Sequence, residues 1–578
     1  MFDSLCTHAL AWEYNKTLYN ARIDKITQPK KHTVIVTVRK PGKNHSILLD
    51  ASPDSCHTRI SNQSFINPIT PPKFCMLLRK YLASARIVSV EAIENERIIN
   101  FNIQGRHPNG HLSNWVLSLE IMGKHSNLLF YDKDTNIILG ALKILNSSSN
   151  SQREIAPNIP YTPPPRQNKI TLQGDNISDL KLIAVSSSNH FLDKFLFQNV
   201  NMVSPKLAKE VVYKVFKDVN AKVGEVSDHT WEKIYNLLYS LIYTPQCNPS
   251  IFYDEDNLVD FYLFNLEHLN LKTKTKPTLN EAIDTFYTHK SKQEEVQKLH
   301  FTLSKSISSQ IKKLNKKLKS LKKDLVKNEK GEKYKLYGEL ITANMHTLKK
   351  GLKTVTLYNY YDNTYIKIPL KASLTPNENS QRYFKKYAKA KRGIEIIKSN
   401  IQECENDLNY LNSVKYSIDI SGLSELMEIK QELNKMGYLS SKDKGKSAKK
   451  ETESSKPMKF VSSDNISIYV GKNNKQNDTL TLKMANPNDL WFHTKNIAGS
   501  HVVVRNEKII PQKTIEEAAM LAAYYSKAKH SGNVEVDYTE IKNVRKPKKA
   551  KPGMVIYDNY TTVFVTPEAN TIKNLQPK

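Results

Sequence analysis

Cysteine and long apolar runs are scarce in this chain of 578 residues. The five cysteines, Cys6, Cys56, Cys75, Cys247 and Cys404, form no Cys-x-x-Cys pair, so the sequence indicates neither a disulfide framework nor a zinc module. No run of about 18 apolar residues occurs, which argues against a transmembrane helix. The first residues, MFDSLCTHALAWEY, lack the basic start and the apolar stretch of a signal peptide, so we expect a cytoplasmic protein.

Acidic residues are also in deficit. The chain has 57 Asp and Glu against 86 Lys and Arg, which gives a formal net charge of +29. This excess favours a polyanionic partner, either a nucleic acid or a membrane surface, and the lack of apolar spans argues against the membrane. With 39% hydrophobic residues, the chain has enough apolar side chains for several cores. Its length predicts about three or four domains.

A regular apolar pattern extends over residues 291–414. Apolar residues recur at steps of three and four from Val296 to Leu325, and again from Tyr383 to Leu411. Two such seams around a short insert predict an antiparallel hairpin of one chain rather than an oligomerisation helix. At ~1.5 Å per residue, an arm of roughly 38 residues reaches about 57 Å. The lysines on its outer positions form either an RNA contact or a solvated face, and both interpretations stay open.

The first 155 residues read mainly as strands, with one helix at Lys73–Leu82 after Pro71-Pro72. Two places there carry candidate chemistry. Glu96-Arg97 precedes a strand, and an Arg beside a carboxylate is a fork suited to phosphate or a base edge. In EIMGKHSN, residues 120–127, a glycine next to Lys124 and His125 lets backbone approach a sugar-phosphate chain. The alternative is an ordinary ion pair and an ordinary β-turn.

The middle of the chain changes character twice. Prolines between Pro157 and Pro165 predict an extended linker. Beyond it, residues 191–197 and 206–216 resemble the paired helices of a helix-hairpin-helix. Their turn lacks the glycine that lets helix amides meet a phosphate, so we expect a structural role. A strand pair within residues 355–368 and a new helix near Pro376 interrupt the apolar pattern.

A polar segment, residues 440–456, predicts a flexible linker before the last domain. There, aromatic and small residues around DLWFHTKNIAGSH and a proline-framed lysine loop suggest RNA contact by stacking, backbone approach and charge. The candidates are Asp489, Trp491, His493, Gly499, Ser500, His501, Lys546, Lys548, Lys549 and Lys551. We considered a metal site at Asp489, His493 and His501, and a Ser500 nucleophile, and favour neither.

Three stretches, PPKFCMLLRKYL, NERIINF and EIMGKHSNLLFYD, resemble the bacterial RqcH type of the NFACT family. The resemblance covers nearly the whole chain and implies tRNA binding by Glu96, Arg97, Glu120, Ile121, Met122, Lys124 and His125. The family usually has Asp where this chain has Glu96. The family implies a fold like that of formamidopyrimidine-DNA glycosylases for the N-terminal domain, but not that activity, because Phe2 offers no amine nucleophile.

The implied fold class is α+β multidomain. It comprises a glycosylase-like β-rich domain (1–155), a Pro-rich linker (156–178), a helical region (179–280), coiled-coil arms (281–334 and 380–436) around a small tip domain (335–379), a flexible linker (437–457) and an α/β RNA-binding NFACT-R domain (458–578).

The resemblance also implies a function in quality control of stalled ribosomes. The expected partners are the large ribosomal subunit with its rRNA, peptidyl-tRNA and alanyl-tRNA, and the expected result is an alanine tail on the nascent chain. We expect no catalytic site, cofactor or metal, no membrane contact, and a monomer on the ribosome. The alternative is a surface adhesin that binds fibronectin, which would require export and anchoring.

Overall fold

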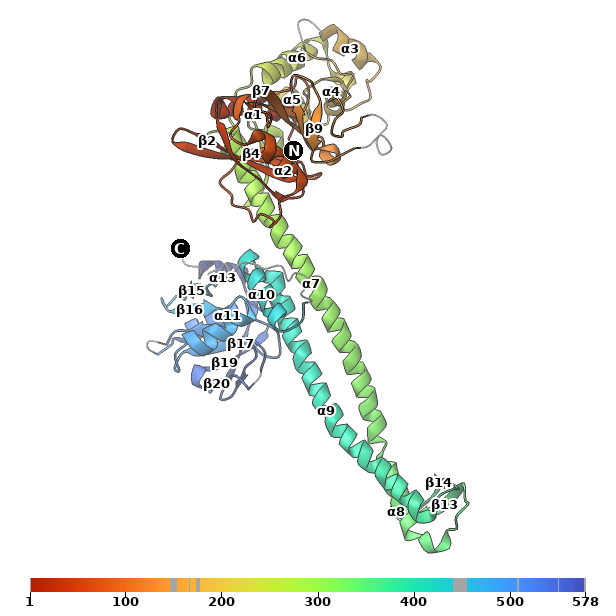
Figure 1. The fold of residues 1–578 in the computed structure, drawn as a ribbon. Coiled ribbons are helices and arrows are strands. Elements are labelled where there is room, and N and C mark those ends of the chain that lie inside the picture. The colour runs from red at the N-terminus through yellow and green to blue at the C-terminus, as the bar shows by residue number, and fades with distance from the viewer. Residues whose placement is uncertain are drawn as a thin grey trace. The chain divides into compact units, whose positions relative to one another are not determined.

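The computed structural model describes residues 2–145, 153–165, 167–172, 177–439, 455–506, 509–548 and 550–575. The chain divides into two compact units, Met1–Ser291 and Lys292–Lys578, and each is considered by itself. Both units mix helices and strands (Figure 1), so the expected multidomain α/β class is confirmed at that level. Among the described residues, no helix combines the length and the apolar character needed to cross a bilayer.

A large antiparallel sheet dominates the first unit. Within the described residues it has nine strands in the order β4-β3-β2-β1-β5-β6-β7-β8-β9. Strands β2 and β3 pair across a turn at Pro41-Gly42, where Lys40 lies opposite Lys43. The bounds are β1 (Arg22–Lys30), β2 (Thr33–Lys40), β3 (Lys43–Asp50), β4 (His57–Ile60), β5 (Arg86–Ala92), β6 (Ile98–Arg106), β7 (Leu112–Glu120), β8 (Asn127–Asp132) and β9 (Ile138–Ala141).

Helices cover this sheet and continue into a helical part. Helix α2 has the bounds expected from the sequence, and α4 and α5 are the two expected helices after the proline-rich segment. Their buried side chains and those of the sheet form one continuous hydrophobic core. The helices are α1 (Ser4–Leu18), α2 (Lys73–Leu82), α3 (Ile177–Val185), α4 (Leu192–Asn199), α5 (Pro205–Phe216) and α6 (Asp228–Tyr243), and a small sheet contains β10 (Ser250–Asp254), β11 (Asn257–Tyr262) and β12 (Lys272–Thr275).

The segment expected to be a plain linker packs on the sheet at its start. Ile155 forms a bridge with Leu145, and Pro160 forms one with Ile137 next to β9. Ile155 is buried in a small apolar cluster with side chains of β7 and β8, and Tyr161 packs against that cluster. The extended form that the prolines predict is therefore present, but residues 155–161 are part of the folded unit.

Helix α7 (Leu279–Glu329) begins inside the first unit, where polar side chains hold its first turn. The Glu13 carboxylate accepts hydrogen bonds from the backbone amides of Leu279 (3.1 Å) and Asn280 (3.3 Å), which lack partners within the helix. The Asn280 amide accepts from Ile60 N–H (2.6 Å), donates to Ile60 C=O (3.0 Å) and accepts from the Tyr14 hydroxyl (3.2 Å). The helix thereby pairs with the end of strand β4.

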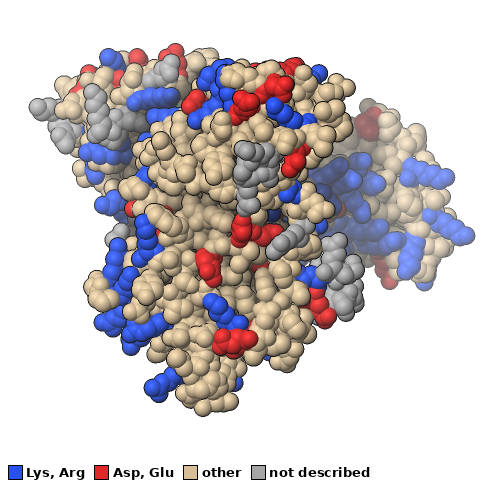
Figure 2. All heavy atoms as spheres, turned by 90° about the horizontal axis from the view of Figure 1, so that it is seen from above, with Lys and Arg blue, Asp and Glu red and all other residues tan. Residues whose placement is uncertain are grey.

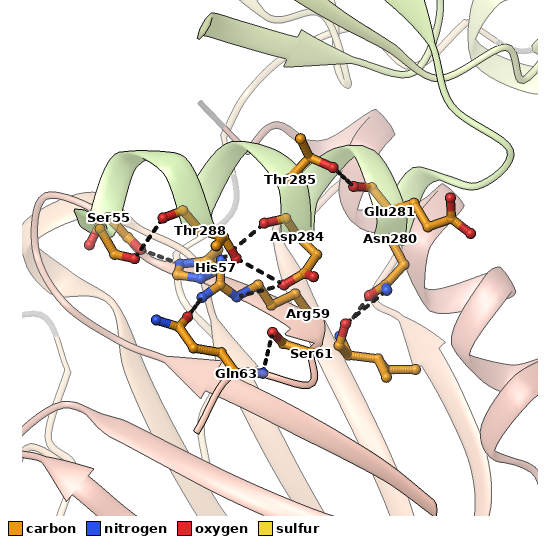
Figure 3. A network of polar contacts seen from close by, with 12 residues as sticks. Ser55, His57, Arg59, Ser61, Gln63, Asn280, Glu281, Asp284, Thr285 and Thr288 are labelled. Carbon is orange, nitrogen blue, oxygen red and sulfur yellow. Dashed lines mark hydrogen bonds and ion pairs between the residues drawn. The ribbon is translucent and has the colours of Figure 1, made fainter. Parts of the chain in front are cut away.

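One turn further along, α7 is held by buried side chains of β4 (Figure 3). Arg59 is 2% exposed, lies 3.5 Å from the Asp284 carboxylate and donates to the Gln63 side chain at 2.7 Å. The His57 ring stacks on Tyr287 at a centroid distance of 3.6 Å. Burial lowers the pKa of His57 to about 3, so the stacked ring is neutral at physiological pH. These contacts fix the start of the long helix to the sheet domain.

In the second unit, α7 pairs with α9 (Pro376–Ile420) in antiparallel fashion. His300 contacts Asp419 at 3.3 Å, and further along α7 the Cys404 thiol donates to the Leu314 carbonyl at 3.4 Å. Contact positions that rise along one helix fall along the other, so the two described helices lie antiparallel within one chain. Its apolar cluster contains Leu303, Ile307, Tyr410, Leu411, Val414, Ile418, Leu426, Ile429 and Leu433.

A small tip follows α7, as expected from the change of period. Helix α8 (Glu332–Ala343) packs on α9, and β13 (Thr354–Asn359) pairs with β14 (Thr364–Pro369). Helix α9 begins at a capping box. Thr375 N–H donates to the Glu378 carboxylate at 2.7 Å, and Glu378 N–H donates to the Thr375 hydroxyl at 3.3 Å.

The C-terminal part of the second unit contains another antiparallel sheet. Within the described residues, its order is β15-β16-β18-β17-β19-β22. Helix α12 (Gln512–Tyr524) packs on one face. The other elements are α10 (Leu423–Lys435), α11 (Asn474–Thr479), α13 (Ala569–Asn574), β15 (Met458–Val461), β16 (Ser467–Val470), β17 (Leu490–Thr494), β18 (Val502–Val504), β19 (Val534–Glu540), β20 (Val544–Arg545), β21 (Ile556–Tyr557) and β22 (Thr561–Val565).

Polar side chains join this sheet domain to α9 and α10. Their carboxylates and hydroxyls come from the helices, and the amide and ammonium groups come from the sheet domain. The contacts are Lys472 to Glu425 (3.0 Å), Asn473 to Glu428 (2.8 Å), Asn474 to Ser413 (3.0 Å) and Lys551 to Asp407.

Candidate nucleic-acid interface

Arg97 lies in the turn between β5 and β6, where the sequence placed the first candidate site. Glu96 and Arg97 are both half-buried in this turn. The Arg97 carbonyl accepts the Ile121 amide at 2.8 Å. The turn that carries Arg97 is thereby joined to the EIMGKHSN segment, and a guanidinium at this place suits an external anion.

Glu120 is the last residue of β7 and is 1% exposed. Its carboxylate accepts two hydrogen bonds from Arg153, at 2.8 and 2.7 Å, and one from the Tyr161 hydroxyl at 3.2 Å. Ile121 is also buried. These two members of the predicted tRNA site therefore lie beneath the surface, and the exposed part of the segment is the turn that follows them.

That turn is a short 3-10 helix, Gly123–His125, in which Lys124 and His125 are exposed. Gly123 has φ +58, a conformation that favours glycine, and a Cβ there would meet nothing within 4 Å. The Met122 amide donates to the Ser126 hydroxyl at 2.8 Å. The loop is thus a hydrogen-bonded turn with an open surface.

Two lysines near this loop were missed at the level of sequence. Lys143 donates to the Ser126 carbonyl (2.6 Å) and to the Ala51 carbonyl (2.8 Å), and burial lowers its pKa. Lys169 donates to the Phe197 carbonyl at 2.7 Å, and burial together with nearby Arg97 lowers its pKa. Isolated lysines carry no local signal, because only the fold brings Lys143 to Ser126 and Lys169 to Arg97.

The aromatic and small residues predicted for RNA contact in the C-terminal domain are largely buried. Trp491 is 0% exposed, so its ring has no free face for base stacking. Asp489 is also 0% exposed and accepts from Arg505 at 2.9 Å. Gly499 is required for packing, since a Cβ there would lie 2.8 Å from the Ser526 Cβ. Ser500 is 4% exposed.

His493 and His501 lie together beside Trp491, with their ring centroids 5.5 Å apart. Nδ1 of His501 is 2.8 Å from the Thr481 hydroxyl. Burial lowers the pKa of His493 to about 4 and that of His501 well below its ordinary value. Among the described residues, no group of three or more His, Cys, Asp or Glu is arranged to hold a metal ion.

The lysine loop divides into inner and outer members. Lys546 pairs with Asp478, and Lys551 pairs with Asp407 and the Tyr438 hydroxyl. Burial opposes the charge of Lys551, but these hydrogen bonds raise its pKa. Lys548 is exposed, and Lys549 lies outside the described residues. The loop is thus partly a docking element, and Lys548 is the exposed one among its described lysines.

Basic side chains also spread over the outer surface. Figure 2 shows Lys and Arg across the face in view, with acidic groups between them. Together with the net charge of +29, this distribution suits a polyanion.

These features define a multidomain α/β protein with basic candidate sites for nucleic acid in both units. Residues 3–452 match the NFACT N-terminal and middle domains, and residues 456–559 match the NFACT protein RNA binding domain. The chain therefore belongs to the NFACT family.

Relatives match it over its length. It is 37% identical over 577 residues to the Rqc2 homolog RqcH of Bacillus subtilis (strain 168), covering 100% of this chain and 99% of that protein. The ribosome quality control complex subunit NEMF of Mus musculus is 22% identical over 616 residues, covering 91% of this chain and 56% of that protein. Among solved structures, the C-terminal part of the fibronectin/fibrinogen-binding protein from Streptococcus suis is 34% identical with a TM-score of 0.40, covering 49% of this chain and 100% of that one.

Proposed function

We propose that the protein is a cytoplasmic ribosome quality control factor that acts as a monomer on large ribosomal subunits carrying peptidyl-tRNA. It recruits alanyl-tRNA, and the nascent chain is extended with an alanine tail that marks it for degradation. The full-length similarity to Rqc2 homologues supports this role. The observation that carries the tRNA assignment is that Arg97 lies near Lys169 and is joined through its carbonyl to the segment with the open glycine turn.

The proposed tRNA site comprises Arg97, Lys124, His125 and Lys169 as direct contacts. Arg97 presents a planar fork to a phosphate or base edge, and the lysines supply charge. Glu96, Ile121 and Met122 shape the turn around them. The site needs no catalytic group, because positioning of substrates is its whole contribution and the ribosome performs peptidyl transfer.

We further propose that the finer domain description expected from the sequence applies, including a glycosylase-like fold for residues 1–155 and RNA binding by residues 458–578. For the latter, exposed lysines such as Lys548 make the contacts. The burial of Trp491 and Ser500 supports a structural role for them instead. The adhesin alternative is not favoured, since the relatives that match the full chain are Rqc2 homologues.

The proposal is tested with Arg97→Ala on purified large subunits that carry peptidyl-tRNA. Loss of a charge-assisted contact of ~1.5–3 kcal/mol lowers tRNA affinity by roughly 10- to 100-fold, while subunit binding through the rest of the chain persists. Lys233→Ala, which removes an exposed cation on helix α6, serves as the control. Unchanged tRNA recovery with Arg97→Ala would contradict the site.

A further inference from the structure

The carboxylate of Glu120, at the end of β7, is hydrogen-bonded by side chains from a later segment of the chain. Arg153 and Tyr161 belong to the segment that packs on the sheet after β9, 33 and 41 residues along the chain. Arg153 meets both carboxylate oxygens, and the Tyr161 hydroxyl donates to one of them. Burial and the charge of Glu120 raise the pKa of Tyr161, so its hydroxyl stays protonated as a donor.

The ion pair of Glu120 and Arg153 is largely closed to solvent and packs against aromatic rings. The side chains of Glu120 and Arg153 are 1% and 9% exposed. Tyr161 stacks on Tyr131 of β8 with a centroid distance of 4.5 Å and an interplanar angle of 7°. The Arg153 guanidinium lies 5.3 Å from the Tyr161 ring centroid. Because Arg153 uses both terminal nitrogens on Glu120, it has little left to offer a bound RNA.

The anchored residue stands directly before the candidate turn. The next amide, Ile121 N–H, donates to the Arg97 carbonyl at 2.8 Å. The following amide, Met122 N–H, closes the loop onto Ser126. A displacement of Glu120 is thus passed through two consecutive amides to the backbone of Arg97 and to the Gly123–His125 turn.

We propose that Arg153 and Tyr161 are positioning residues of the tRNA site, acting through Glu120 on the turn and on Arg97. This inference rests on the proposed function. It gives Glu120 the role of an anchor rather than that of an RNA contact, and it makes the segment around Ile155 part of the site.

The test measures binding of alanyl-tRNA to the full chain for Arg153→Lys, which keeps the charge but loses the bidentate fork. We expect the dissociation constant to rise about tenfold, as for loss of a charged hydrogen bond. Tyr161→Phe leaves the ion pair in place and gives a smaller rise. Glu210→Gln removes another buried carboxylate, which accepts from His268 at 2.7 Å, and serves as the control for general destabilisation.

A double variant that combines Arg153→Lys with Arg97→Ala shows whether Arg153 positions Arg97 or contacts the tRNA itself. If Arg153 acts through Arg97 and its turn, Arg153→Lys adds less than about twofold once Arg97 is absent. Hydrogen exchange at the Ile121 and Met122 amides should accelerate in Arg153→Lys and stay unchanged in Glu210→Gln.

Additive losses in the double variant would overturn the inference, and so would wild-type affinity of both Arg153→Lys and Tyr161→Phe. Should Arg153→Lys fail to fold, Tyr161→Phe with the same exchange measurement decides the matter. Wild-type affinity of Arg97→Ala would instead remove the proposed tRNA site itself, together with the inference built on it.

Discussion

Replacement of Asn280 by Ala is expected to loosen the attachment of α7 to the first unit. The Asn280 side chain makes three hydrogen bonds, to both backbone groups of Ile60 and to the Tyr14 hydroxyl. Tyr14 is 0% exposed, so its hydroxyl cannot turn to water when the amide is removed. An orphaned buried group costs ~1–3 kcal/mol and a partly solvated one less, which gives a loss of about 2–4 kcal/mol.

The assay is urea unfolding of the full chain, combined with hydrogen exchange of peptides from residues 57–61 and 279–288. Because these peptides belong to the first unit, their exchange rates report its stability separately from that of the second unit. Asn315→Ala is the matched control, because Asn315 is exposed on the same helix. The control should change stability by no more than about 0.5 kcal/mol. An equally small effect of Asn280→Ala, with unchanged exchange at the start of α7, would refute the proposed attachment.

Three further predictions concern binding and pH. Affinity for large subunits should fall steeply between 50 and 200 mM salt, roughly as for several phosphate contacts, and a salt-insensitive complex would indicate protein docking. Lys548→Ala should weaken RNA binding and leave thermal unfolding unchanged, whereas Lys551→Ala should lower the melting temperature of the second unit, because its ion pair with Asp407 is lost. As pH drops from about 6.5 towards 4, the second unit should lose stability, because His493 takes up a proton in the unfolded chain but stays neutral in the folded one. His493→Gln should therefore make the unfolding midpoint depend less on pH over this range. An unchanged slope in that variant would contradict the prediction.

Local pattern was enough for much of the architecture. Helix α2 follows from apolar spacing after two prolines, and the start of α9 follows from Thr375, Pro376 and Glu378, because caps and periodicity involve residues within a few positions. The pairing of α7 with α9 could be predicted because the apolar residues of each helix recur on the one face that packs against the other helix.

The candidate sites were harder to predict, since their residues are defined by distant partners. Arg153 lies 33 residues from Glu120, and Lys551 lies 144 residues from Asp407. Nothing next to either residue in sequence indicates such pairing. Trp491 lies in a strand whose neighbouring side chains point to opposite faces of the sheet. Both faces are covered by apolar clusters, so Trp491 is buried as well as Phe492, and the strand sequence alone does not show this.

The most direct test of the central claim is sequencing of the RNA that co-purifies with the full chain from cells. The account predicts tRNA, with alanine tRNA enriched over its cellular share, alongside RNA of the large subunit, and a selective loss of the tRNA fraction in Arg97→Ala. Recovery of ribosomal RNA alone, or a tRNA fraction that does not depend on Arg97, would contradict it.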